Sequence, residues 1–262
     1  MPLMKTISLL KKLPDEDLAL GEGQIDLWVE YLDDASPLGA AAHSLLSPEE
    51  LARAGRFICD SHHRGYIALR IMQRRILSQY AGMHPESLEF GRGRYGKPFL
   101  ILRCNETPLY FSISRSTGVA LLAVTGIGEI GVDIENVLDF HDRDAIAERF
   151  FSPREREVFD SLPFDAKNEA FFRCWTRKEA LLKAMGVGLM TPPEKVDVRL
   201  GRGPFPSGFI AVRDPETEAR WILKDIEVVD GFASALALRE GPVEPFVRIR
   251  KCYRRKQNRF LE

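Results

Sequence analysis

Apolar and polar residues alternate along several short stretches of the chain, a pattern that predicts half-buried antiparallel strands. Apolar residues spaced three and four apart predict two long helices, over Ile67–Tyr80 and Phe171–Met185. The glycine-rich, basic segment Gly91–Pro98 is interpreted as a loop. The predicted strands are Ile25–Val29, Tyr110–Ile113, Val119–Val124, Gly131–Ile134, Lys195–Arg199, Phe209–Val212, Trp221–Val228 and Ala233–Leu238.

The order of these elements repeats once along the chain. Leu46–Glu50 and Phe151–Glu155 each place a serine before a proline and a glutamate three residues after the serine, which predicts a helix start with a capping box. Upstream of each helix start, a predicted strand carries an aspartate, in Gln24–Leu27 and in Gly131–Ile134. Because a long helix follows each start, we infer that one structural unit is duplicated.

The duplication predicts an α+β fold with two similar lobes, each a mainly antiparallel sheet packed with a long helix. We place the N-terminal lobe at residues 1–127 and the C-terminal lobe at 128–242, with the active site in the cleft between them. Residues 243–262 are interpreted as a solvated or partly disordered tail. This tail is basic because it contains Arg248, Arg250, Lys251, Arg254, Arg255, Lys256 and Arg259.

Composition narrows the functional classes. Hydrophobic residues make up 45% and charged residues 29% of the chain, as in soluble globular proteins. The net charge of -1 does not favour nucleic acid or an anionic membrane as partner. The longest apolar run, Val119–Ile130, is too short to span a bilayer, and the four cysteines lack the spacing of a disulfide framework. We therefore expect a soluble, cytoplasmic monomer.

Two carboxylates mark the strand Gly131–Glu135. Asp133 and Glu135 are two residues apart, so their side chains lie on one face of the strand. Two like charges on one face repel each other unless a cation lies between them, and carboxylate oxygens suit Mg2+. The alternative is that the strand simply ends in water, and for this short motif alone that alternative is favoured.

A second candidate group lies on the predicted helix Phe171–Met185. Glu179 and Lys183 are four residues apart and share one helix face. Taken alone, this pair is best explained as a surface ion pair. Glu155 completes the second capping box, and we place that structural role ahead of a chemical one.

Basic residues form the third candidate group, which could bind phosphate. The alternative is an ordinary solvated basic surface. The group consists of Arg53, Arg56, His63, Arg64, Arg92, Arg94, Lys97 and the segment Ser114–Ser116.

Together and in this order, the motifs resemble the surfactin-synthetase-activating type of 4'-phosphopantetheinyl transferase. The resemblance runs from about Leu46 to about Leu238. Its specific core is G-V-D-I-E at Gly131–Glu135, F-S-P-R-E at Phe151–Glu155 and W-T-R-K-E-A-L-L-K at Trp175–Lys183. Weaker landmarks are R-Y-G-K-P at Arg94–Pro98 and F-S-I-S-R-S at Phe111–Ser116.

The resemblance implies an enzyme that transfers the 4'-phosphopantetheine of coenzyme A to a serine of an apo acyl or peptidyl carrier protein. It implies that Asp133, Glu135 and Glu179 hold Mg2+ on the pyrophosphate, and that Lys183 contacts phosphate and stabilises the leaving group. It assigns the phosphate end of coenzyme A to Lys97, Ser114 and Arg115, with Arg53 and Arg64 nearby. Glu179 is the first candidate for the general base, while Glu155 or a metal-bound water remain open.

The sequence departs from the family pattern at one position of the phosphate motif. The family usually has Ser-His-Ser where this chain has Ser114, Arg115 and Ser116. Arginine can bind phosphate but stays protonated, so Arg115 cannot act as a base. Two other functions stay open: another Mg2+-dependent enzyme acting on phosphate esters, such as a nuclease, and a non-catalytic homologue that binds carrier proteins.

Overall fold

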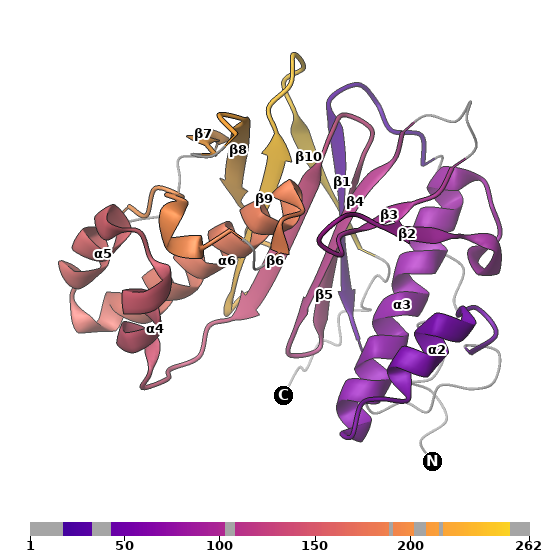
Figure 1. The fold of residues 1–262 in the computed structure, drawn as a ribbon, viewed down its shortest axis with the longest axis horizontal. Helices are drawn as coiled ribbons and strands as arrows, with labels where there is room; N and C mark the ends of the chain where they lie inside the picture. Colours follow the sequence, from indigo (N-terminus) through magenta and orange to yellow (C-terminus); the bar gives the residue numbers. More distant parts are fainter. Residues whose placement is uncertain are drawn as a thin grey trace, which may run out of the picture.

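The computed structural model describes residues 18–32, 43–102, 108–188, 191–201, 208–214 and 217–251. The fold is mixed α+β and contains two four-stranded sheets and a two-stranded hairpin. In Figure 1 the sheets lie next to each other in the centre, with α3 on one side and α6 on the other. This confirms the α+β part of the prediction.

The first sheet has the strand order β10-β1-β5-β4. Its strands are β1 (Gln24–Tyr31), β4 (Tyr110–Ser116), β5 (Val119–Thr125) and β10 (Phe246–Lys251). Strands β1, β5 and β4 pair antiparallel, while β10 runs parallel to β1. Helices α2 (Pro48–Ala54) and α3 (Asp60–Ala81) belong to this half, and Met72 and Ile76 of α3 share a core with Leu122 of β5.

The second sheet is antiparallel throughout and has the order β6-β9-β8-β7. Its strands are β6 (Ile130–Asn136), β7 (Ile210–Arg213), β8 (Arg220–Asp225) and β9 (Phe232–Arg239). Helices α4 (Arg143–Phe150), α5 (Pro153–Asp160) and α6 (Lys167–Met185) accompany it. Phe171 and Leu181 of α6 pack in one core with Ala235 of β9, so α6 covers the outer face of this sheet.

The inner faces of the two sheets meet in a third core. Leu27 and Leu121 of the first sheet pack there with Val132, Ile134 and Leu236 of the second. Alternation along the strands sends every second residue into this core and the others toward a helix. Burying both faces of each sheet explains why β5 is apolar at nearly every position.

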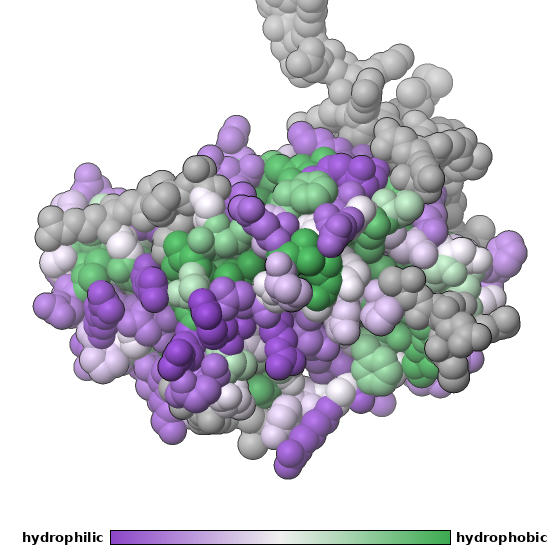
Figure 2. Space-filling view, turned by 90° about the horizontal axis from the view of Figure 1, so that it is seen from above, coloured by the Kyte–Doolittle hydropathy of each residue, from purple (hydrophilic) through white to green (hydrophobic). Residues whose placement is uncertain are grey.

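Short elements connect these parts. They are the single 3-10 turns η1 (Pro85–Ser87), η2 (Phe164–Ala166) and η4 (Pro193–Lys195), and the hairpin strands β2 (Phe90–Arg92) and β3 (Pro98–Leu100). The surface is mixed: Figure 2 shows hydrophobic side chains at several separate places, with hydrophilic side chains between them. Of the helices in the described ranges, none is long and apolar enough to cross a membrane.

Both predicted capping boxes are confirmed. The hydroxyl of Ser47 accepts the N–H of Glu50, and the Glu50 carboxylate accepts the N–H of Ser47. Ser152 and Glu155 make the same reciprocal pair at the start of α5. Each box satisfies two N–H groups that the first helical turn leaves without partners.

Three predictions about local structure need correction. Gly91–Pro98 is a loop only in part: residues 93–97 form the turn of the β2–β3 hairpin, while Gly91, Arg92 and Pro98 belong to its strands. Lys195–Arg199 does not form a strand: Val196 and Val198 are buried, but the N–H of Val198 donates to the Glu155 carboxylate, and Arg199 has a φ of 55°. The alternation here reflects core contacts without a partner strand.

The third correction concerns the C-terminal tail. Residues 246–251 are not an unstructured tail, since they form β10 beside β1. Arg248 and Arg250 donate from β10 to the carboxylate of Asp26, whose side chain is fully buried. The two arginines therefore neutralise a buried acid that lies far away in the sequence. Residues 252–262 lie outside the described part of the chain.

Candidate functional site

Strand β6 and helix α6 approach each other unusually closely at Gly131. A Cβ atom added to Gly131 would lie 1.9 Å from the Ala180 carbonyl oxygen and 2.5 Å from the Ala184 nitrogen. Only glycine fits at this distance, because both neighbours are backbone atoms of the helix. The contact places Glu179 and Lys183 of α6 next to the carboxylates of β6.

Lys183 and Asp133 form the centre of the site. Lys183 Nζ lies 2.6 Å from Asp133 Oδ1, and it also donates to Ser114 Oγ at 3.0 Å. Ser114 in turn donates to Asp133 Oδ1 at 2.7 Å. Asp133 is buried, and its second oxygen, Oδ2, has no hydrogen-bond partner. The aspartate is thus held from one side while an unsatisfied oxygen remains on the other.

Glu135, two residues further along β6, accepts a hydrogen bond from Ser116 Oγ at 2.8 Å. Burial raises the pKa of the Glu135 carboxyl, and the charges of Asp133 and Glu179 act in the same direction. The Ser116 hydrogen bond and the charge of Lys183 oppose this rise but do not cancel it. Glu135 therefore belongs electrostatically to the same site as Asp133 and Glu179.

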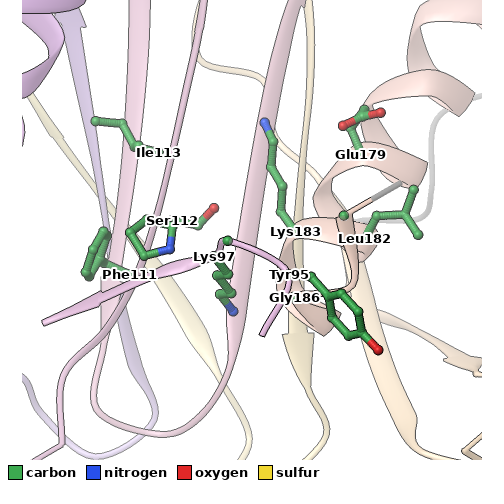
Figure 3. A pocket seen from close by; sticks show the side chains of 12 residues that line it. Tyr95, Lys97, Phe111, Ser112, Ile113, Glu179, Leu182, Lys183 and Gly186 are labelled. Atoms are coloured by element: carbon green, nitrogen blue, oxygen red, sulfur yellow. The ribbon is translucent and has the colours of Figure 1, made fainter. Parts of the chain in front are cut away.

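Glu179 and Lys183 line a pocket of about 320 Å3. Figure 3 shows both residues on α6, across the pocket from Phe111, Ser112 and Ile113 of β4. Burial raises the pKa of the Glu179 carboxyl, and the nearby charge of Asp133 raises it further. A carboxylate with a raised pKa is a better proton acceptor near neutral pH than an ordinary one.

Lys97 lines the same pocket, but its amine is directed elsewhere. It donates to the Ala184 carbonyl oxygen at 2.9 Å and forms an ion pair with Glu129. In Figure 3 the Nζ atoms of Lys97 and Lys183 point in opposite directions. Lys97 also borders an adjoining groove of about 1070 Å3. Burial lowers the pKa of Lys97 despite the neighbouring Glu129 carboxylate.

The other predicted phosphate contacts are not gathered at this pocket. Ser114 contacts Asp133 and Lys183 from β4, whereas Arg115 follows it and lies on the opposite face of that strand. Arg53 of α2 lies over the Tyr66 ring, and Arg64 of α3 lies 3.7 Å from Asp60. None of the three arginines lines the pocket of Glu179 and Lys183.

The Glu155 carboxylate is held by backbone N–H groups and a lysine in the protein interior. Its carboxylate accepts the backbone N–H groups of Ser152 and Val198, each at 2.7 Å, and pairs with Lys178 at the same distance. The carboxylate is almost completely buried, and Glu155 is not among the residues that line the Glu179 pocket. The geometry therefore supports the capping role and gives Glu155 no access to a substrate in that pocket.

The carboxylates fit a metal that is completed by its substrate. Within the described ranges, no three or more His, Cys, Asp or Glu side chains converge to hold a metal ion by themselves. Mg2+ usually takes only one or two protein carboxylates and completes its shell with water and substrate phosphate. The free Oδ2 atom of Asp133 and the mutual repulsion of the three carboxylates fit such an arrangement.

Sequence reasoning missed three features of the site. Gly131 looked like an ordinary strand residue, although its position just before the carboxylates was visible. Ser116 was grouped with the phosphate motif, but it holds Glu135. Arg177, inside the helix motif, forms a bidentate, buried ion pair with Asp225 that anchors α6 to the end of β8. For the Ser116 contact, the signal in the sequence was the alternation of serines at 112, 114 and 116.

Comparison with known proteins assigns this site to a family. The sequence model of the 4'-phosphopantetheinyl transferase superfamily matches residues 129–237. A model of the N-terminal part of 4'-phosphopantetheinyl transferases matches residues 38–126. The chain belongs to the 4'-phosphopantetheinyl transferase superfamily, which confirms the resemblance inferred from the motifs.

Individual relatives are also named as phosphopantetheinyl transferases. The chain is 39% identical to the 4'-phosphopantetheinyl transferase HetI of a Nostoc species, over 70% of this chain and 77% of the relative. It is 26% identical to the 4'-phosphopantetheinyl transferase Sfp of Bacillus subtilis, over 74% and 82% of the two chains. It is 27% identical to the human L-aminoadipate-semialdehyde dehydrogenase-phosphopantetheinyl transferase, over 74% and 67%.

Proposed function

We propose that this protein transfers the 4'-phosphopantetheine group of coenzyme A to a serine hydroxyl of an apo acyl or peptidyl carrier protein. Adenosine 3',5'-bisphosphate is the second product. Membership of the superfamily supports the reaction class. The observation that carries the proposal is the pocket in which Glu179 and Lys183 lie beside Asp133.

The proposed metal is Mg2+, held by Asp133, Glu135 and Glu179 against the pyrophosphate of coenzyme A. Bound there, the ion would neutralise charge on the pyrophosphate oxygens as the bond to the leaving group breaks. The free oxygen of Asp133 and the raised pKa values of the two glutamates support this assignment. The Asp133 oxygen is an acceptor without a donor, and the two glutamates are carboxylates whose ionised form is disfavoured by burial and by their acidic neighbours.

Side chains of the protein carry out proton transfer and stabilise the leaving group. The carrier serine oxygen forms the new bond to the phosphorus next to pantetheine, and the bond from that phosphorus to the bisphosphate breaks. Glu179 accepts the serine proton, a role supported by its place in the pocket beside Lys183. Lys183 stabilises the negative charge that develops on the leaving oxygen.

Basic residues are assigned to the nucleotide end of coenzyme A. We assign Lys97 to coenzyme A phosphate because it borders the pocket, which requires its amine to leave Glu129. Arg115, Arg53 and Arg64 remain candidates for the same end through the family resemblance. The Ser114 hydroxyl is engaged with Asp133 and Lys183, so we assign it as a partner of those two residues ahead of a phosphate contact.

We further propose that the fold is a duplicated lobe divided near residues 127 and 128, with the active site between the lobes. Two family models meeting between residues 126 and 129 support the division. The capping boxes of α2 and α5 and the aspartates Asp26 and Asp133 on β1 and β6 support the repeat. We also propose that the protein is a monomer, because the inner faces of the two sheets are buried against each other within one chain. The proposed setting is the cytoplasm, which the free thiols of Cys59 and Cys174 support.

Mass spectrometry tests the reaction directly. Several apo carrier proteins, from peptide, polyketide and fatty-acid systems, would be incubated with coenzyme A, Mg2+ and the protein. We expect at least one carrier to gain the mass of a single phosphopantetheine, and we expect Glu179→Gln to abolish the gain. If no carrier is modified by the wild-type protein, the proposed reaction is wrong.

A further inference from the structure

Three serines of β4 join the two sheets where β4 and β6 lie side by side. Ser112, Ser114 and Ser116 alternate along the strand, so their hydroxyls lie on one face, toward β6. Ser112 Oγ accepts the N–H of Val132 at 3.1 Å, and Ser116 Oγ accepts the N–H of Asn136 at 3.2 Å. Side-chain hydroxyls of β4 thus take the place of main-chain acceptors for the N–H groups of β6.

Two of these serines also bind the site carboxylates, and their hydroxyl geometry makes the contact directional. A hydroxyl has one proton to donate. Ser116 Oγ accepts from Asn136, which leaves its proton for Glu135 at 2.8 Å. Ser114 Oγ accepts from Lys183 Nζ at 3.0 Å, which leaves its proton for Asp133 at 2.7 Å. Each carboxylate therefore receives one oriented donor from the opposite sheet.

We infer that Ser114 and Ser116 are positioning residues that orient Asp133 and Glu135 for a divalent cation. The inference rests on the proposed function, since it takes these carboxylates as the metal ligands. It goes further by giving Ser114 a role toward the carboxylate and lysine instead of toward substrate phosphate. Groups that hydrogen-bond to metal ligands typically contribute about 10- to 100-fold to metal affinity.

Ser234 of β9 provides a control outside the pocket. It is a buried strand serine whose hydroxyl donates to the backbone carbonyl of Ile226, and it is not among the residues that line the Glu179 pocket. Ser234→Ala therefore removes a buried strand hydroxyl without removing a donor to a carboxylate. Ser116→Thr keeps a hydroxyl at the third position, and β-branched residues are well accommodated in strands.

The test is a titration of the full-length protein with Mn2+ in the presence of coenzyme A and without carrier, followed by the electron paramagnetic resonance signal of free Mn2+. No turnover occurs without carrier, so the titration reports binding alone. We expect Ser116→Ala and Ser114→Ala to weaken Mn2+ binding by about 10-fold or more. Ser234→Ala should leave the affinity within about twofold of wild type, and Ser116→Thr should restore most of the loss.

The outcomes separate this inference from the proposed function. Equal Mn2+ affinity in wild type and Ser116→Ala would overturn the positioning role, as would an equal loss in Ser234→Ala or no Mn2+ uptake by the wild type. A wild-type protein that binds Mn2+ with coenzyme A but modifies no carrier would contradict the transferase proposal and leave the positioning role intact. Urea denaturation of each variant shows whether a loss of affinity merely reflects a loss of folding.

Discussion

Lys183 pairs with Asp133 of β6 at 2.6 Å instead of forming a surface pair with Glu179 on its own helix. The side chain of Asp133 is only 4% exposed, so the lysine charge balances a desolvated carboxylate. A surface pair would contribute a few tenths of a kcal/mol, whereas a buried carboxylate that loses its partner is strongly destabilised. The pairing therefore gives Lys183 a role in the resting protein, in addition to its proposed role in transfer.

Replacing Lys183 by alanine tests both roles. We expect Lys183→Ala to lower the turnover number by about 100-fold or more, because a donor to the leaving oxygen is lost. We also expect the free energy of unfolding to fall by about 1–3 kcal/mol, because Asp133 stays buried without its cation. Carrier modification rates and urea denaturation measure the two effects. Lys195→Ala, at an exposed lysine outside the pocket, is the control for loss of one positive charge.

Glu179→Gln separates proton transfer from packing. Glutamine has nearly the same shape, so the unfolding free energy should change by less than about 1 kcal/mol, as for a substitution that conserves volume. The rate of transfer should fall by about 100-fold or more, since a general base typically contributes 10^2 to 10^4. Single-turnover mass spectrometry with saturating coenzyme A measures the chemical step. Normal turnover in this variant would exclude Glu179 as the base.

Much of the fold and of the site could be predicted because local patterns determine them. Ser47 and Ser152 begin helices through contacts within one turn, and strand alternation alone places Asp133 and Glu135 together. The motif on α6 likewise depends on helical spacing. These features need only the chain's immediate neighbourhood, so the sequence was sufficient for them.

The remaining features depend on contacts between distant segments. The arginines of β10 looked solvated because the segment around them is mainly basic, whereas Asp26 on β1, more than 200 residues earlier, is their partner. Ser116 meets Glu135 only because two separate sheets pack edge to edge along β4 and β6. Lys97 was expected at phosphate, and its pairing with Glu129 could not be foreseen from a turn motif.

The pair formed by Lys97 and Glu129 yields a discriminating prediction. Glu129→Gln removes the competing carboxylate, so the Lys97 amine becomes available to phosphate. We expect the KM for coenzyme A to fall about two- to fivefold, within the range of a single exposed ion pair, with kcat nearly unchanged. Steady-state kinetics at fixed carrier concentration measure the effect. A higher KM in Glu129→Gln would instead show that the pair of Lys97 with Glu129 mainly holds the β2–β3 hairpin in place.

Asp26 links stability to pH. Burial raises the pKa of its carboxyl, but hydrogen bonds from Arg248 and Tyr80 and the charge of Arg250 outweigh burial and hold the pKa below its ordinary value of 3.8. A lowered pKa stabilises the folded state above pH 3.8, and this contribution is lost as the pH falls through the folded-state pKa. Wild-type protein should therefore lose stability in strong acid through this group.

Asp26→Asn should remove that dependence. At pH 7 we expect the variant to be about 3–5 kcal/mol less stable, because two arginines lose the buried acid that they share. Between pH 5 and 2 its stability should fall less than that of wild type. Urea denaturation across this range measures both effects, and Asp165→Asn at an exposed aspartate is the control. Parallel pH curves for wild type and Asp26→Asn would contradict the linkage.

Gly131→Ala tests whether the close contact of β6 and α6 builds the site. The added Cβ would meet backbone atoms of Ala180 and Ala184, which cannot rotate away as a side chain could. Strand and helix must separate, so we expect a loss of about 3 kcal/mol or more, at the upper end of overpacking effects in protein cores. Transfer should fall even in protein that remains folded, because Lys183 moves away from Asp133. Gly241→Ala is the matched control, since an added Cβ there meets nothing within 4 Å. Comparable unfolding midpoints and rates for the two variants would show that the close contact does not determine the geometry of the site.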